Sequence, residues 1–320
     1  RSTVSRYATV SFMENMVKSL GCTSIQKMAM QVLTQENWIS RDKGCQFSPS
    51  FVITLIETTK ATLDLEIKRE CSEAIHQFSR LRAFHEIIVN SASEMLVPHL
   101  TFKDISSKAW AVKTLAQVGQ STALLSKLKS FGIVSAAFKC FLMTSLQRPL
   151  EHEILESCVK ILAVLSPFHE LRHDMIQVEG GKGFQKLIDV FDKSMLSKNY
   201  GLLTSCLKIF VSYVNSANKE SSGNANLKLI SEKRLYKLIS EFSLSENIQT
   251  HSTVVELLLA YAQHNNVPIV DFWEHIVEKL IEELKCNGNY NMKILQRDEV
   301  MKAMNTILRK GKKPSFCPTR

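Results

Sequence analysis

The sequence is poor in residues that interrupt regular structure and in residues that cross-link a secreted fold. Only 11 glycines and 7 prolines occur in 320 residues, too few to punctuate a fold of many short strands. None of the eight cysteines forms a C-x-x-C pair, and there is no N-x-S/T acceptor or signal peptide at the start. We therefore expect a reducing compartment, cytoplasmic or nuclear. The chain begins at Arg1 rather than Met, which leaves open that it is a piece of a longer protein.

Long apolar runs and the motifs of common enzymes are also missing. The best apolar run, 201–214, is interrupted by Lys208 and is shorter than the roughly 20 residues that span a bilayer. No P-loop, dinucleotide-binding glycine pattern, kinase motif set or nucleophile elbow is present. These absences argue against a membrane span and against nucleotide-dependent chemistry, and we expect no cofactor.

One catalytic pattern does occur. The segment 169–173, with His169, Glu170 and His173, matches H-E-x-x-H, in which two histidines four apart on a helix bind zinc and the glutamate acts as base. No third ligand follows at the H-x-x-G-x-x-H spacing, and the motif follows Pro167 on a short connecting segment. We therefore expect no metal at these histidines, and a zinc hydrolase is the disfavoured interpretation.

The chain carries more basic than acidic side chains. Lysine and arginine number 40 and aspartate and glutamate 31, for a net charge of +9. A basic surface favours acidic partners such as nucleic acid, anionic lipid or acidic peptides. The alternative is an ordinary, mildly basic soluble protein.

A short phrase recurs four times at nearly constant spacing. Its four copies occupy residues 111–115, 158–162, 206–210 and 254–258, and successive copies are 47, 48 and 48 residues apart. An earlier copy, 74–78, fits at a shorter step of 37. A fixed period of this length marks a stack of helical repeats. The sequence therefore predicts an all-α fold, a right-handed α-solenoid.

The segment from Val159 to Phe191 resembles the armadillo repeat. That family has a long apolar helix, a short Arg-containing helix, paired small residues and a second apolar helix. Arg172, Gly180-Gly181 and Leu187 occupy the positions that match this pattern. The resemblance implies armadillo-like repeats. By the regularity of the period we expect degenerate helices over 1–80, armadillo-like repeats over 81–309 and a basic tail over 310–320.

The segment 109–116 is similar to the groove-lining helix of the importin-alpha family, which clamps an extended basic peptide with a Trp and an Asn four residues later. Trp110 matches the Trp, but Thr114 replaces the Asn. Later repeats lack both residues, since their Trp positions hold Ser157, Ser205 and Thr253 and their Asn positions hold Ile161, Ile209 and Leu257. A nuclear-import receptor is not predicted. The resemblance still implies that this helix of each repeat faces a concave groove.

Three lysines share one position in consecutive repeats, namely Lys113, Lys160 and Lys208. Because packed helices lie roughly 8–10 Å apart, their ammonium groups are expected to form a row that suits an acidic segment or a phosphate backbone. The alternative is an ordinary solvated helix position. The predicted groove residues are Trp110, Lys113, Thr114, Ser157, Lys160, Ser205 and Lys208.

These observations predict a non-enzymatic scaffold. We expect it to bind a partner helix or an extended acidic segment of a partner protein in the groove, within a cytoskeletal, ciliary, nuclear or chromosomal assembly. The alternative is direct nucleic-acid or chromatin binding through the basic groove and tail, although few aromatic residues lie beside the lysines for base stacking. The partner's identity and the oligomeric state are not predicted.

Overall fold

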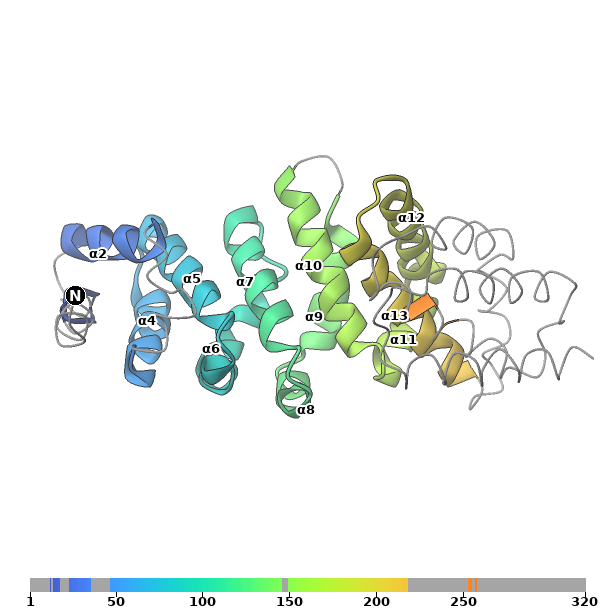
Figure 1. Ribbon diagram of the computed structural model, residues 1–320, viewed down its shortest axis with the longest axis horizontal. Helices are drawn as coiled ribbons and strands as arrows, with labels where there is room; N and C mark the ends of the chain where they lie inside the picture. Colours follow the sequence, from blue (N-terminus) through green and yellow to red (C-terminus); the bar gives the residue numbers. More distant parts are fainter. Residues whose placement is uncertain are drawn as a thin grey trace, which may run out of the picture. The chain divides into compact units, whose positions relative to one another are not determined.

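The computed structural model describes residues 12, 14–17, 23–35, 47–145, 149–217, 253–254 and 257, and within these ranges it contains helices and no strand (Figure 1). This confirms the all-α prediction. The helices are α2 (Thr23–Gln35), α4 (Pro49–Ala61), α5 (Leu65–Ser79), α6 (His85–His99), α7 (Ile105–Val118), α8 (Thr122–Ser130), α9 (Ile133–Met143), α10 (Pro149–Leu165), α11 (His169–Gln177), α12 (Lys182–Leu196) and α13 (Tyr200–Ala217), with 3-10 turns η1 (Arg82–Phe84) and η2 (Val178–Gly181).

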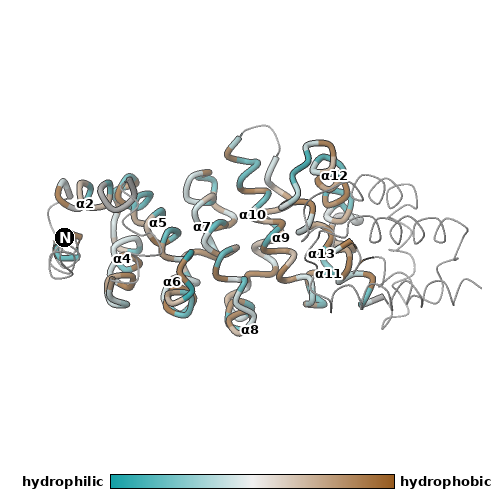
Figure 2. The backbone as a smooth tube through the Cα atoms, in the orientation of Figure 1, coloured by the Kyte–Doolittle hydropathy of each residue, from teal (hydrophilic) through white to brown (hydrophobic). Residues whose placement is uncertain are grey.

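The chain forms two compact units, Arg1–Gly183 and Phe184–Arg320. In the first unit, α5 packs against α7 and α7 against α10 (Figure 1). Helices α4, α6 and α9 form a second row that packs against this one. Helix α2 extends the first row by packing on α5. Each helix carries both apolar and polar residues along its length (Figure 2), as expected for amphipathic helices that bury one side in a layered stack.

The repeated phrase marks one helix of each repeat. Its copies lie on α5, α7, α10 and α13. The side chains predicted to be buried are at most 1% exposed, and they are Val112, Leu115, Val159, Leu162, Leu207 and Phe210. The sequence register is therefore confirmed for α7, α10 and α13. The basic tail and most of the residues after 217 lie outside the described residues, and the predicted division at residues 80 and 309 stays a prediction.

The shorter step of 37 has a structural cause. In later repeats a nine-residue helix, α8 or α11, precedes the second helix. Before α6 this element shrinks to η1, which is three residues long. The missing helix accounts for most of the shortening and makes this repeat a reduced version of the others.

The predicted turn at Gly180-Gly181 is present. The two glycines have φ of 68° and 85°, in the left-handed region where only glycine is unstrained. Just before them, the Arg172 guanidinium donates hydrogen bonds to the carbonyls of Ser166 and Pro167 at 3.0 and 2.6 Å. Arg172 therefore connects the short helix α11 to the end of α10.

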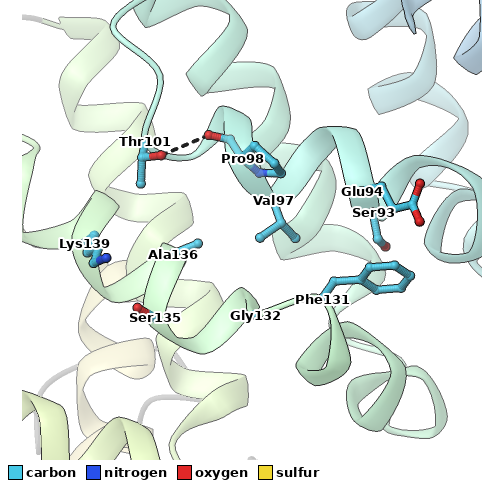
Figure 3. A pocket seen from close by; sticks show the side chains of 10 residues that line it. All are labelled: Ser93, Glu94, Val97, Pro98, Thr101, Phe131, Gly132, Ser135, Ala136 and Lys139. Carbon is cyan, nitrogen blue, oxygen red and sulfur yellow. Dashed lines mark hydrogen bonds between the residues drawn. The ribbon is translucent and has the colours of Figure 1, made fainter.

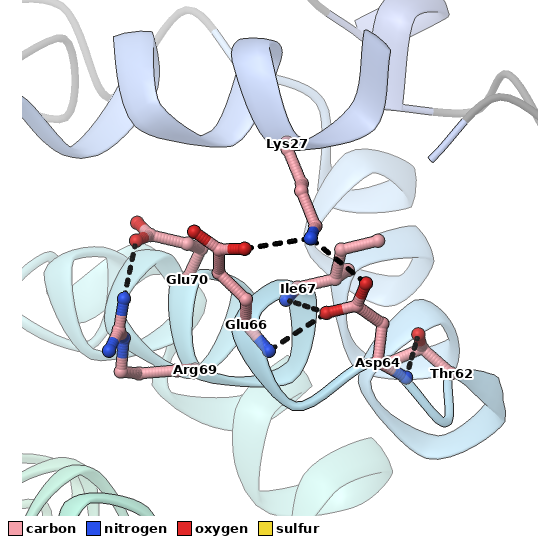
Figure 4. Close-up of polar contacts among 7 residues, drawn as sticks. All are labelled: Lys27, Thr62, Asp64, Glu66, Ile67, Arg69 and Glu70. Carbon is pink, nitrogen blue, oxygen red and sulfur yellow. Dashed lines mark hydrogen bonds and ion pairs between the residues drawn. The ribbon is translucent and has the colours of Figure 1, made fainter. Parts of the chain in front are cut away.

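Ion pairs attach α2 to the start of α5. The Lys27 ammonium lies 3.0 Å from Asp64 and 2.7 Å from Glu66 (Figure 4). Asp64 also caps α5, since its carboxylate accepts the backbone N–H groups of Glu66 and Ile67. The hydrogen bond from Lys27, followed by that from the Ile67 amide, lowers the pKa of Asp64. One carboxylate thus begins a helix and connects it to its neighbour.

Candidate partner-binding face

The candidate site is the exposed side of the row α5, α7 and α10. A helix packed between two neighbours and a second layer is covered on three sides. In α7 this buries Ala109, Ala111, Val112, Thr114, Leu115, Ala116 and Val118 and leaves a strip at Trp110, Lys113 and Gln117. We define the Trp110 face as that strip together with the partly or fully exposed neighbours Glu73 and Gln77 on α5 and Glu153, Glu156 and Lys160 on α10.

Helix α7 begins at a well-defined cap, which holds the strip in register. Asp104 accepts the backbone N–H of Ser107 at 2.7 Å, a typical N-cap interaction that satisfies an otherwise unpaired donor. Hydrogen bonds from the Ser107 side chain and backbone lower the pKa of Asp104. Trp110 follows within two turns of this cap.

Trp110 lies half-buried between two side chains. Its ring centroid is 5.4 Å from that of His76 on α5, and the Lys113 ammonium lies 4.8 Å from the ring. The first contact joins α5 to α7, and the second is a cation–π interaction along one helix. The indole is therefore held in place while part of it stays accessible.

Two of the three predicted lysines are paired with glutamates. Lys113 contacts Glu153 on the neighbouring helix at 2.5 Å, and Lys160 contacts Glu156 one turn away at 2.8 Å. The third, Lys208, is exposed on α13 in the second unit. On the first unit, therefore, Lys113 and Lys160 do not form a row of unpaired ammonium groups.

Three predicted groove residues are buried. Thr114 is 0% exposed, Ser157 8% and Ser205 9%. The Thr114 hydroxyl has no hydrogen-bond partner, and Ser205 donates to the carbonyl of Gly201 at 3.0 Å. These side chains belong to the packed sides of their helices and are not available to a partner, which is a correction to the sequence expectation.

Glu73 is a residue of the face that the sequence analysis missed. It occupies the Trp110 position one repeat earlier, at the 37-residue step that was used for the phrase 74–78. Burial, and then the nearby Glu70 carboxylate, raise the pKa of Glu73. Among the residues that the structure describes, no hydrogen bond or ion pair satisfies this carboxylate. The register alone was the signal that could have found it.

His76 stands where the later repeats carry Lys113 and Lys160. Burial, assisted by the charges of Arg80 and Lys113, lowers its pKa to about 4. Its Nδ1 has no hydrogen-bond partner. At neutral pH His76 is therefore an uncharged ring that supports Trp110.

The H-E-x-x-H histidines lie on α11. Their rings stack with centroids 6.0 Å apart, and Glu170 is bound to the Lys129 ammonium at 2.6 Å. That hydrogen bond lowers the pKa of Glu170. Within the described ranges no group of three or more His, Cys, Asp or Glu residues is placed to hold a metal ion.

A separate hollow of about 420 Å³ lies between α6 and α9, in the other row of helices. Small side chains such as Ser135 and Ala136 border it, with Val97 and Phe131 supplying apolar walls (Figure 3). Glu94 and Lys139 also line it. No sequence pattern pointed to this hollow.

Comparisons with known proteins agree with the repeat architecture. No family model and no curated protein matches the chain. A designed armadillo repeat protein is 15% identical, with a TM-score of 0.55, and the match covers 82% of this chain and 100% of that one. A second design, for modular peptide recognition, is 14% identical over the same shares with a TM-score of 0.55.

A structure described as the interaction between cadherin and beta-catenin gives a TM-score of 0.64 at 15% identity. The match covers 94% of this chain and 56% of that one. Identities this low establish the fold alone. The chain is thus an all-α solenoid with an armadillo-like helical-repeat fold. Where the structure describes the chain, no helix has the length and apolarity needed to cross a membrane.

Proposed function

We propose that this protein is a non-enzymatic interaction scaffold that binds a helix or extended segment of a partner protein on the Trp110 face. The observation that carries the proposal is the Trp110 ring, held between His76 and Lys113 yet partly accessible. Anchors of this kind contribute much of the affinity of protein interfaces, because a large rigid ring buries area at little entropic cost. The neighbours described as peptide-recognition designs and as a cadherin–beta-catenin interaction support the same class of function.

The charges on the face favour a partner segment that contains a basic residue. The face carries three glutamates and two lysines, and each lysine is paired with a glutamate. Glu73, on the helix next to Trp110, is the one glutamate of the face with no ion pair among the described residues. A lysine or arginine of the partner can pair with Glu73 and contact the indole. The acidic segment expected from the sequence is less well supported on this face, because Lys113 and Lys160 are already paired with glutamates.

The alternative of nucleic-acid binding has weaker support. Phosphate recognition depends on unpaired lysine and arginine side chains, whereas Lys113 and Lys160 are ion-paired. Generic oligonucleotides titrated at several salt concentrations test it. Tight binding with a steep salt dependence would favour this alternative over a protein partner.

The test of the proposal is a quantitative comparison of partners retained by the wild-type chain and by variants. Trp110→Ala is expected to weaken the main partner's binding at least tenfold, because loss of an anchor costs about 2 kcal/mol or more. Phe102→Ala is the matched control, since it removes a 54% exposed aromatic side chain outside the face. Equal retention by all three folded proteins would contradict the proposal.

Charge variants test the partner's chemistry. Glu73→Lys is expected to weaken binding of a basic segment, and more so at low salt, where exposed charges are least screened. The triple change of Lys113, Lys160 and Lys208 to Glu is expected to leave the fold intact, because substitutions at solvent-accessible positions usually change stability little. Strong loss with the triple variant and none with Glu73→Lys would identify an acidic partner instead.

The cellular setting forms part of the proposal. A scaffold without an enzymatic site acts within a larger assembly, and we propose a cytoskeletal, ciliary, nuclear or chromosomal one in the cytoplasm or nucleus. Imaging of a fluorescently tagged full chain, together with the identity of the retained partners, tests this. Secretion of the tagged chain would contradict it.

A further inference from the structure

Two cysteines of neighbouring helices meet in the core of the first unit. Cys140 lies on α9 and Cys158 on α10, and the Cys158 thiol donates a hydrogen bond to the Cys140 sulfur at 3.3 Å. Both side chains are 0% exposed. The two residues are 18 positions apart in the sequence, so only the packing of α9 on α10 brings them together.

We propose that Cys140 and Cys158 are a redox modification site, at which a reversible disulfide joins α9 to α10. A disulfide bond is about 2.05 Å long, so the sulfurs need to approach by little more than 1 Å. Because the fold already holds the thiols side by side, closing the ring costs little further entropy, and the second thiol acts at a high effective concentration. In a reducing compartment such a bond forms transiently, in response to oxidants.

The position of Cys140 provides a route for the oxidant. It lies in the last turn of α9, which ends at Met143, and Met143 is 66% exposed. Helix ends open locally far more often than the whole domain unfolds. Cys158 lies in the middle of α10. Cys140 is therefore the thiol that reacts first, and Cys158 is the one that resolves the intermediate.

The reaction balances with a low-molecular-weight disulfide such as glutathione disulfide as oxidant. The Cys140 thiolate attacks one glutathione sulfur, the glutathione S–S bond breaks, and one glutathione thiolate leaves. Cys158 then loses its proton to solvent, and its thiolate attacks the Cys140 sulfur, which releases the second glutathione. The two protein thiols lose two protons and two electrons, and glutathione disulfide is reduced to two glutathione molecules.

The chain offers a direct readout. Trypsin cuts after Lys139 and Lys160 but not at the Arg148-Pro149 bond, and cleavage after glutamate then yields Cys140–Glu151 and Ser157–Lys160. After treatment of the purified full chain with glutathione disulfide and blocking of remaining thiols, these fragments should stay joined at a mass two hydrogens below their sum. Dithiothreitol should separate them. Oxidation should also raise the thermal midpoint, on the order of 5 °C for a ring of this size.

Variants separate the two roles. Cys158→Ala should accumulate a glutathione adduct at Cys140 that the wild type does not retain. Cys71→Ala is the matched control, because Cys71 is a buried thiol on α5, and it should keep the Cys140–Cys158 link. The proposal is overturned if the wild-type fragments separate after oxidation, or if either cysteine links to a different one. The measurement uses the protein without a partner, so its outcome is independent of the proposed function.

Discussion

At the scale of single residues, the Trp110 face depends on side chains whose charge is set by burial. His76 supports Trp110 as a neutral ring, because burial lowers its pKa to about 4. The pKa of Glu73 is shifted in the opposite direction, because burial and then the nearby Glu70 carboxylate raise it. Glu73 and His76 are three residues apart on α5, so both effects act on the same side of that helix.

The state of His76 predicts a pH dependence of stability. Below pH 6.5 the unfolded chain binds a proton that folded His76 does not, so the free energy of unfolding falls as the pH drops from about 6.5 to about 4. The loss attributable to His76 approaches about 3 kcal/mol at the lower end. His76→Phe should flatten this slope in urea unfolding at pH 6.5, 5.5 and 4.5. His152→Gln on α10 is the control, since it removes an exposed histidine, and an unchanged slope in His76→Phe would contradict the assignment.

At the scale of elements, the repeat that contains α11 and α12 depends on a close approach at the start of α12. In the first turn of α12, a Cβ at Gly183 would lie 2.6 Å from the Phe138 ring of α9 and 3.2 Å from the Cα of Met175. Glycine at this position is a packing requirement, since its φ is not in the left-handed region. The helix therefore keeps a poor helix former where a side chain would push α9 and α11 away.

This contact predicts an unusual effect of alanine. Gly183→Ala should destabilise the protein by about 1–3 kcal/mol, because overpacking outweighs the gain of up to about 1 kcal/mol in helix propensity. Gly201→Ala, at an exposed position in the first turn of α13, is the control and should be neutral or stabilising. Thermal unfolding of the two variants shows whether each substitution raises or lowers stability. A stabilised Gly183→Ala protein would contradict the prediction, because it would mean that the Phe138 ring moves aside without loss of packing energy.

At the scale of the whole molecule, a solenoid has a distributed core, because each repeat buries its apolar side only against its neighbours. In the first unit, Phe78 is surrounded by the rings of Phe47, Phe51 and Phe84 at centroid distances of 5.4, 6.0 and 5.1 Å. In the second, Phe210 meets Phe184 and Phe191. We therefore expect defects to act locally.

Hydrogen exchange measured by mass spectrometry tests this expectation. Phe78→Leu should cost about 1–3 kcal/mol and speed exchange in α4, α5 and α6 while leaving α13 near its wild-type rate. Phe210→Leu should produce the reverse pattern. Uniformly faster exchange along the chain in both variants would mean that the molecule unfolds as one cooperative body.

The architecture and its register were predictable from the sequence because they are local and periodic. Apolar residues at helical spacing identify the buried side of each helix, and the repetition of the phrase at 47 or 48 residues identifies equivalent helices. This was enough to predict the burial of Val112, Leu115 and their counterparts, and the turn at Gly180-Gly181. Each of these depends on one helix or one turn.

The composition of the candidate face was decided by tertiary packing. By spacing alone, Thr114 lies on the same side of its helix as Trp110. In the structure, α5, α10 and the second layer cover three sides of α7. The strip of α7 that stays accessible is therefore too narrow to include Thr114. The Lys113–Glu153 pair and the Cys140–Cys158 contact join residues 40 and 18 positions apart. The period fixes how each side chain is rotated about its own helix axis. Which side chains meet also depends on the offset and angle between helices, and only the packed structure sets these.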